Sequence, residues 1–183
     1  MQITETSLPG VLLVQPRVFG DARGYFLESY RQDRFEEAGI PEAFVQDNES
    51  FSTRGILRGL HYQWPKPQGK LIRVIRGSVY DVAVDVRQDS ATLGQWVGVE
   101  LSGENKHQLW VPPGFAHGFC VSSDEALVVY KCTDYYAPEC EQALLWSDPA
   151  LGITWPTDAP QLSPKDIAGI PLAEIASANL PDC

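Results

Sequence analysis

The residues with the clearest chemical potential lie in the stretch RGLHYQWPKPQGKLIRVIRG, which contains His61. A histidine side chain exchanges a proton near neutral pH, so His61 could serve as a general acid or base. The surrounding segment, residues 50–80, contains no Asp or Glu. It carries six basic residues instead, which are Arg54, Arg58, Lys66, Lys70, Arg73 and Arg76.

Two interpretations of this positive segment are open. Basic side chains protect an exposed edge strand from pairing with other chains, so the charges could simply be solvated. The whole chain has a net charge of −10, however, and a local positive patch on an acidic protein would concentrate a small anionic ligand. The pI near 4.6 argues against nucleic acid as a partner, because binding to a phosphate backbone needs a basic surface.

The elements that would hold these residues are mostly strands. The run VYDVAVDVR, residues 79–87, alternates apolar and polar side chains, and residues 96–101, 107–113 and 126–136 behave similarly. Short strands separated by turns rich in Gly and Pro predict a mainly β protein, a sandwich or barrel. We expect few helices: one over residues 31–40, ended by Gly39, and one beginning at Ser163, with Pro164 in its first turn.

The length of 183 residues predicts one domain, residues 1–183, with residues 160–183 forming a helical C-terminal appendage. No apolar run is long enough to span a bilayer, so we expect no membrane partner. The N-terminus shows no secretory signal pattern. The four cysteines contain no C-x-x-C pair, which disfavours both disulfides and a zinc site and favours a cytoplasmic location.

Two segments resemble the two motifs of a cupin jelly roll. The first is the segment around His61, and the second is the run PPGFAHGF, which ends a tight turn with His117. In that superfamily the first motif supplies two histidines and a glutamate to a metal ion, and the second supplies another histidine. Here the first-motif positions are His61, Gln63 and Lys70, and a protonated lysine would repel a divalent cation. We therefore expect a metal-free site, which leaves His61 available for acid–base work.

A more specific resemblance covers residues 18–166. The chain contains, in order, VFGDARGYFLESY, FVQDN, LRGLHYQ, QGKLIRV, LGQWVGV, WVPPGFAHGF, YKCTDYY, GITWP and LSPKD. This series resembles the dTDP-4-dehydrorhamnose 3,5-epimerase family of deoxysugar biosynthesis. The resemblance implies a metal-free, cofactor-free, cupin-type homodimer that acts on a dTDP-linked 4-keto-6-deoxyhexose.

In such a substrate the C4 ketone acidifies the protons on C3 and C5, and epimerisation needs a base on one face and an acid on the other. The resemblance implies that His61 is the base and Tyr130 the acid. Lys70 would stabilise the negative charge that develops on the C4 oxygen. Asp166 has two possible roles: its spacing from Ser163 is that of a helix cap, and the resemblance implies that it pairs with His61.

The resemblance also implies a set of substrate-binding residues. Arginine is suited to phosphate oxygens, and amides, aromatic rings and carboxylates would contact the sugar and the thymidine. The implied residues are Arg23, Arg58, Phe19, Glu28, Gln46, Asn48, His117 and Tyr135. Without the resemblance, turn formation, strand packing or a hydrogen-bonded core histidine would explain most of these side chains equally well.

Three questions stay open at this level. Arg58 and His61 differ by an odd number, so a regular strand would point them to opposite faces unless Gly59 forms a bulge. The epimerase could act at C3 and C5 or at one carbon only. A non-catalytic cupin that binds a sugar nucleotide would need the arginines and aromatics but not His61, Lys70 and Tyr130 together.

Overall fold

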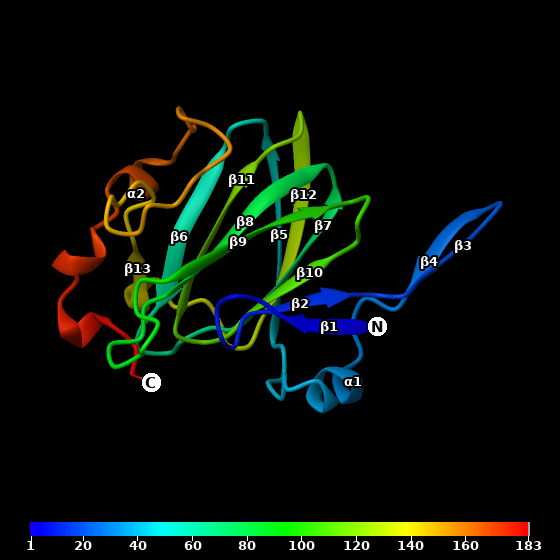
Figure 1. The fold of residues 1–183 in the computed structure, drawn as a ribbon, viewed down its shortest axis with the longest axis horizontal. Coiled ribbons are helices and arrows are strands. Elements are labelled where there is room, and N and C mark those ends of the chain that lie inside the picture. The colour runs from blue at the N-terminus through cyan, green and yellow to red at the C-terminus, as the bar shows by residue number, and fades with distance from the viewer. Residues whose placement is uncertain (183) are drawn as a thin grey trace.

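The computed structural model describes residues 1–182 and is mainly β, as predicted (Figure 1). One sheet has six strands in the order β1-β2-β10-β7-β12-β5. Their bounds are β1 (Gln2–Glu5), β2 (Leu12–Gln15), β5 (Gln46–Thr53), β7 (Lys70–Arg76), β10 (Gln108–Val111) and β12 (Glu125–Cys132). The second sheet has the order β13-β6-β11-β8-β9. Its strands are β6 (Leu57–Gln63), β8 (Ser78–Asp85), β9 (Trp96–Ser102), β11 (Phe115–Val121) and β13 (Glu141–Ala143).

The two sheets face each other and enclose an apolar cluster, which gives the cupin-type jelly roll that the sequence predicted. Ile72 and Val128 reach this cluster from the first sheet, and Ala83 and Phe119 reach it from the second. Every strand pair in both sheets is antiparallel. The non-sequential strand order means that side chains distant in the sequence meet inside the barrel.

The outer faces of both sheets are also covered. Phe35 of α1 (Gln32–Glu37) packs with Trp110 against the outside of the six-stranded sheet. The chain after β13 lies along the outside of the other sheet, where Trp155 and Leu180 pack with Val82 and Val84. Because both faces of β8 are therefore buried, the polar side of its alternating pattern faces the barrel interior rather than solvent.

Both predicted helices form, but they are short. Gly39, with φ of +88°, follows α1 at the position expected of a helix stop. The second helix, α2 (Pro164–Ile167), begins after Ser163, whose side chain accepts a hydrogen bond from the Asp166 backbone N–H. The predicted appendage is less helical than expected: beyond α2 it contains only single 3₁₀ turns, η2 (Leu172–Glu174) and η3 (Ser177–Asn179). Its last residue, Cys183, lies outside the described residues.

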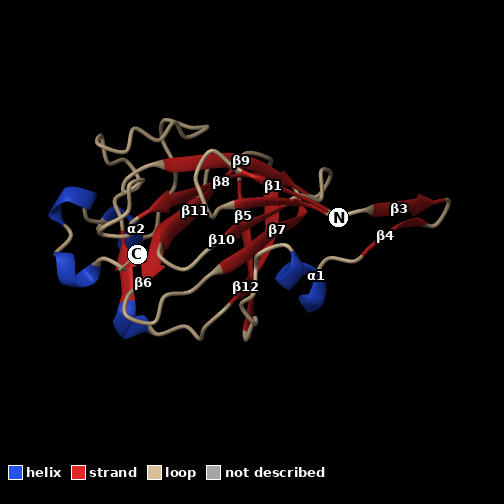
Figure 2. Cartoon of the chain, turned by 60° about the horizontal axis from the view of Figure 1, so that its bottom comes forward, coloured by secondary structure: helices blue, strands red, loops and turns tan. Residues whose placement is uncertain are grey.

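A hairpin of β3 (Val18–Asp21) and β4 (Gly24–Leu27) projects away from the barrel, as both views of the chain show (Figures 1 and 2). It exposes large apolar side chains, with Phe26 68% and Phe19 49% exposed. Within residues 1–182 no helix is long and apolar enough to cross a membrane.

Candidate active site

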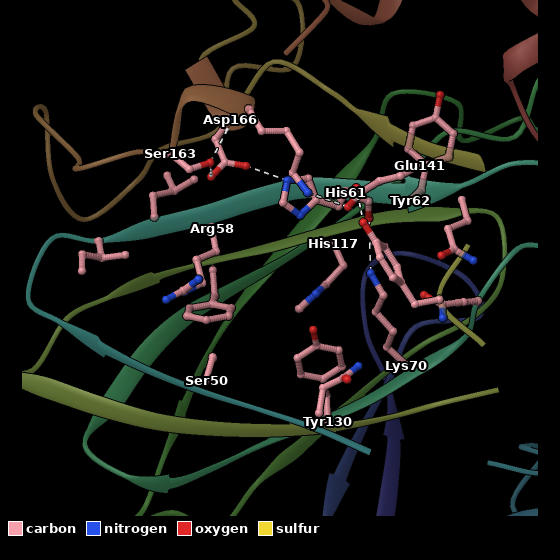
Figure 3. Close-up of a pocket in the computed structure, with 18 of the residues that line it drawn as sticks. Ser50, Arg58, His61, Tyr62, Lys70, His117, Tyr130, Glu141, Ser163 and Asp166 are labelled. Atoms are coloured by element: carbon pink, nitrogen blue, oxygen red, sulfur yellow. Dashed lines mark hydrogen bonds and ion pairs between the residues drawn. The ribbon is translucent and has the colours of Figure 1, made fainter. Parts of the chain in front are cut away.

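A cavity of about 720 Å³ lies between the two sheets at the end where the barrel interior becomes polar (Figure 3). Of the predicted site residues, it is lined by His61, Lys70, Tyr130, Asp166, Arg58, Gln46, Asn48 and His117. These side chains come from β5, β6, β7, β11, β12 and α2. The fold therefore brings together residues from segments more than 100 positions apart.

A bulge in β6 puts Arg58 and His61 on the same face. His61 lies opposite His117 on β11, whereas Arg58 lies opposite Phe119, so two residues of β6 face the single residue Gly118. Gly59 has a φ of +118°, and a Cβ there would lie 2.6 Å from the Gly118 Cα. Only glycine permits this backbone contact. As a result the side chains of Arg58 and His61 both enter the cavity, although the two residues are an odd number of positions apart in the sequence.

His61 is held by Asp166 from outside the barrel. The Nε2 of His61 lies 2.6 Å from Oδ1 of Asp166, whose other oxygen accepts a hydrogen bond of 2.7 Å from the Ser163 hydroxyl. Asp166 thus contacts His61, as the resemblance implies. At the start of α2 the capping group is Ser163, whose side chain accepts a hydrogen bond from the Asp166 backbone N–H, while the Asp166 carboxylate contacts the Ser163 hydroxyl. Burial raises the pKa of Asp166, but the hydrogen bonds from His61 and Ser163 outweigh burial and leave the pKa below its ordinary value.

An ionised Asp166 can only accept hydrogen bonds, so Nε2 is the ring nitrogen of His61 that carries the proton. Nδ1 is then left with its lone pair. A histidine whose tautomer is fixed by a carboxylate in this way is oriented to take up a proton at the other nitrogen.

Tyr130 and Lys70 project from the opposite sheet. Figure 3 shows the Tyr130 hydroxyl pointing into the cavity toward the sheet that carries His61 and His117. Burial raises the pKa of Tyr130, and the positive charge of Arg58 opposes this effect. Burial also lowers the pKa of Lys70, against the pull of nearby negative groups that include Glu141. The Lys70 Nζ donates to the backbone carbonyl of His61 at 3.4 Å, which places the amine directly beside the base.

Arg58 adds a second cation to the cavity. Its Nε donates to the Ser52 hydroxyl at 2.9 Å, which holds the guanidinium against β5. Among residues 1–182 no carboxylate forms an ion pair with Arg58 or Lys70. Partly buried cations without a counter-ion favour an anionic ligand.

A chain of amides lines the β5 side. Gln46 accepts from the Tyr136 backbone N–H and donates to Asn48 at 3.0 Å, and Asn48 in turn donates to the Cys132 sulfur at 3.5 Å. This chain fixes which end of each amide carries the donors. The Asn48 side chain also bonds to that of Tyr130, an interaction that opposes the effect of burial on the Tyr130 pKa.

The two polar residues that replace cupin metal ligands are otherwise engaged. The Gln63 amide bonds to the backbone of Lys66 and Ala137, and Lys70 contacts the His61 carbonyl. In the described part of the chain no three His, Cys, Asp or Glu side chains gather as a metal ion would require.

Four predicted residues do not line the cavity of this chain. Phe19, Arg23 and Glu28 lie on or next to the projecting hairpin, where Arg23 pairs with Asp21 at 2.5 Å. Tyr135 is 66% exposed.

The cavity also contains residues that the sequence prediction missed. Tyr136 lines it in place of Tyr135, and its hydroxyl donates to Glu141, which also binds Lys165 at 2.6 Å. Burial raises the pKa of Glu141, but the bonds from Lys165 and Tyr136 leave it below its usual value. Asp81, which binds His117, was missed as well. Its place on the polar side of the run VYDVAVDVR was the available signal.

Comparison with known proteins identifies the family of this chain. The family described as dTDP-4-dehydrorhamnose 3,5-epimerase matches residues 5–174. The chain belongs to this family.

Curated members of the family are closely similar over nearly the whole chain. A dTDP-4-dehydrorhamnose 3,5-epimerase of Neisseria gonorrhoeae is 56% identical over 98% of the chain, which spans only 55% of that relative's length. The Shigella flexneri enzyme of the same name is 57% identical, with 92% of this chain and 94% of the relative covered. Among solved structures, the 3,5-epimerase RmlC of Legionella pneumophila in complex with dTDP-4-keto-L-rhamnose has a TM-score of 0.97. The two sequences are 52% identical, and the match covers 100% of this chain and 98% of the Legionella chain.

Proposed function

We propose that this protein inverts C3 and C5 of dTDP-4-dehydro-6-deoxy-D-glucose to give dTDP-4-dehydro-L-rhamnose. The observation that carries the proposal is the arrangement of the cavity: a histidine with a fixed tautomer on one sheet, a tyrosine on the facing sheet, and a lysine beside the histidine. The family's relatives carry the corresponding name, and the related Legionella structure holds a dTDP-4-keto sugar.

The first step is proton abstraction next to the C4 ketone. Nδ1 of His61 takes the proton from carbon, and Asp166 stabilises the imidazolium that forms, through the hydrogen bond of 2.6 Å to Nε2. A positioned base of this kind accelerates such a step by about 10²–10⁴-fold.

The electrons left on carbon move to the C4 oxygen, and Lys70 stabilises that enolate. Its ammonium lies in a low-dielectric cavity and needs no rearrangement during the step. Lys70 contacts the backbone carbonyl of His61, which keeps the ammonium on the same side of the cavity as the residue that supplies the base.

Reprotonation comes from the opposite face of the sugar, by Tyr130. Since burial raises its pKa, the phenol keeps its proton at neutral pH and can donate it to the enolate. Arg58 then stabilises the phenolate, in agreement with the opposing effect of its charge on the Tyr130 pKa. After the first inversion His61 releases its proton to solvent and Tyr130 takes one up from solvent, which restores both groups. The same pair then acts at the second carbon, because C3 and C5 both flank the ketone.

Arg58 is also suited to the diphosphate, with Gln46, Asn48 and His117 as further contacts. Phe19, Arg23 and Glu28 would bind substrate in a homodimer in which the hairpin of one protomer reaches the cavity of its partner. The hairpin projects away from its own barrel (Figure 1), which supports that arrangement. Its exposed apolar side chains support it as well. We place the enzyme in the cytoplasm, where thiols such as the buried Cys132 stay reduced.

The test is incubation of the protein with the keto sugar in D₂O, followed by NMR of the product. Deuterium at both C3 and C5 with inverted configuration is the expected result. Deuterium at one carbon only would instead make the protein a 3- or 5-epimerase. Tight binding of dTDP without exchange at either carbon would make it a non-catalytic sugar-nucleotide binder.

A further inference from the structure

Asp81 is a buried carboxylate directly behind the cavity. It lies on β8, next to β11, and is fully buried. Its Oδ1 lies 2.9 Å from Nε2 of His117, a cavity-lining residue that is itself buried. Its other oxygen, Oδ2, is buried with no hydrogen-bond partner within the described residues.

Burial of a carboxylate with an unsatisfied oxygen is unfavourable, and each such group needs an explanation. Asp85, four residues further along β8, shows what a structural carboxylate looks like in this fold. It is equally buried, but its two oxygens accept hydrogen bonds from Arg87, Ser90 and Thr92, which close the following turn. Asp81 makes no comparable set of bonds, so stability does not account for its presence.

The hydrogen bond to His117 explains the presence of a carboxylate at position 81. As a carboxylate, Asp81 accepts a hydrogen bond from the Nε2–H of His117. Nδ1 is then the ring nitrogen left for another partner, and no residue in the described range bonds to it. A ligand in the cavity is the partner that remains.

We propose that Asp81 is a positioning residue for substrate binding, which fixes the tautomer and orientation of His117 so that Nδ1 contacts the bound sugar nucleotide. The inference rests on the proposed function and deepens it. Asp81 does not touch the substrate and acts through His117 alone.

The test is a double-mutant cycle on the keto-sugar epimerisation with Asp81→Asn, His117→Gln and the double variant. We expect Asp81→Asn to raise KM by about tenfold with little change in kcat, as expected for lost ground-state binding. In the His117→Gln background the same substitution should have almost no further effect on KM. Independent, additive effects of the two substitutions would overturn the proposal.

Two further measurements separate positioning from a structural role. The chain has only three histidines, so ¹⁵N spectra of the imidazoles can identify His117, which should change from a single Nε2–H tautomer to a mixture in Asp81→Asn. The control Asp85→Asn should lower the melting temperature but leave KM and the His117 signals unchanged. An unchanged His117 tautomer in Asp81→Asn would contradict the inference. Failure of the proposed function would appear separately, as wild-type protein that does not turn over the keto sugar.

Discussion

Two histidine–aspartate pairs face the same cavity, and they are built differently. His61 and Asp166 are 105 positions apart, and the aspartate comes from α2, outside the barrel. His117 and Asp81 lie on neighbouring strands inside it. Asp166 has both oxygens bonded, one of them to Ser163, whereas Asp81 has one oxygen unsatisfied.

The difference matches the work that we propose for each pair. A base must approach a carbon and move charge, and the His61 side chain is 23% exposed at the cavity, against 7% for His117. Its partner Asp166 belongs to the C-terminal segment, which follows the strands of both sheets in the sequence and packs on the outside of the barrel. A binding group such as His117 needs only a fixed ring orientation, which its position beside Asp81 on the neighbouring strands β11 and β8 provides. The catalytic pair should therefore depend on how the C-terminal segment docks, and the binding pair should not.

The largest effect is expected from His61→Asn. Loss of the base should reduce kcat by about 10²–10⁴-fold, because no other group replaces its lone pair. Binding of dTDP should change little. Deuterium exchange at C3 and C5 and calorimetric titration with dTDP provide the two measurements. Deuterium exchange that persists in His61→Asn would mean that His61 is not the base.

Asp166→Asn should have the next largest effect. The amide can donate to Nε2, which would favour the wrong tautomer of His61 and reduce kcat by about 10²-fold. KM should stay within a factor of about three. For Asp81→Asn we expect the reverse, a change in KM with little change in kcat. Steady-state kinetics of both variants would show whether one pair acts in catalysis and the other in substrate binding.

Ser163→Ala should give a smaller change of the same kind. It removes both the cap on the Asp166 backbone N–H and the bond to its second oxygen, so stability should fall by about 1 kcal/mol. We expect kcat to fall several-fold and the tautomer of His117 to stay unchanged. Denaturant unfolding and kinetics measure the two effects. A larger change in KM than in kcat would contradict the expectation that Ser163 affects the reaction through Asp166 and His61.

Asp85→Asn should leave catalysis unchanged and act on stability alone. Burial raises the pKa of Asp85, but the bonds from Arg87, Ser90 and Thr92 outweigh it and lower the pKa below the ordinary value. Because the folded pKa lies below the unfolded one, the ionised form stabilises the fold above the unfolded pKa, and this contribution is lost as the pH falls through the folded pKa.

The variant should thus lose about 1.5–3 kcal/mol at neutral pH. The gap to wild type should shrink below about pH 4. Urea unfolding across this pH range is the measurement. A constant gap at all pH values would show that the hydrogen bonds do not depend on the charge of Asp85.

Much of this architecture can be predicted from sequence, for identifiable reasons. Short alternating runs predicted the β fold, because strands with one face on a core must alternate. The pairing of Ser163 with Asp166 predicted α2, because a helix start has a local signature. The basic segment around Lys70 was visible without a structure, but charge alone left a solvated edge strand and an anionic ligand equally open.

What could not be predicted depends on contacts between distant segments. The polar side of β8 faces inward only because Trp155 and Leu180 cover the other side, and this burial hid Asp81 from the site prediction. Tyr135 and Tyr136 lie beyond the end of β12, so no strand period indicated which of them would line the cavity.

The bulge at Gly59 has a consequence for which substrates fit. Arg58 and His61 enter the cavity from one strand, and the contact of Gly59 with Gly118 prevents that strand from sliding along β11. The separation between the backbone positions of Arg58 and His61 is therefore set by the main chain, and the bond to Ser52 limits the movement of the guanidinium. A sugar whose phosphate is attached one carbon further from the ketone, or through a longer spacer, would not reach both groups at once. The protein would reject such a compound by length rather than by charge or shape.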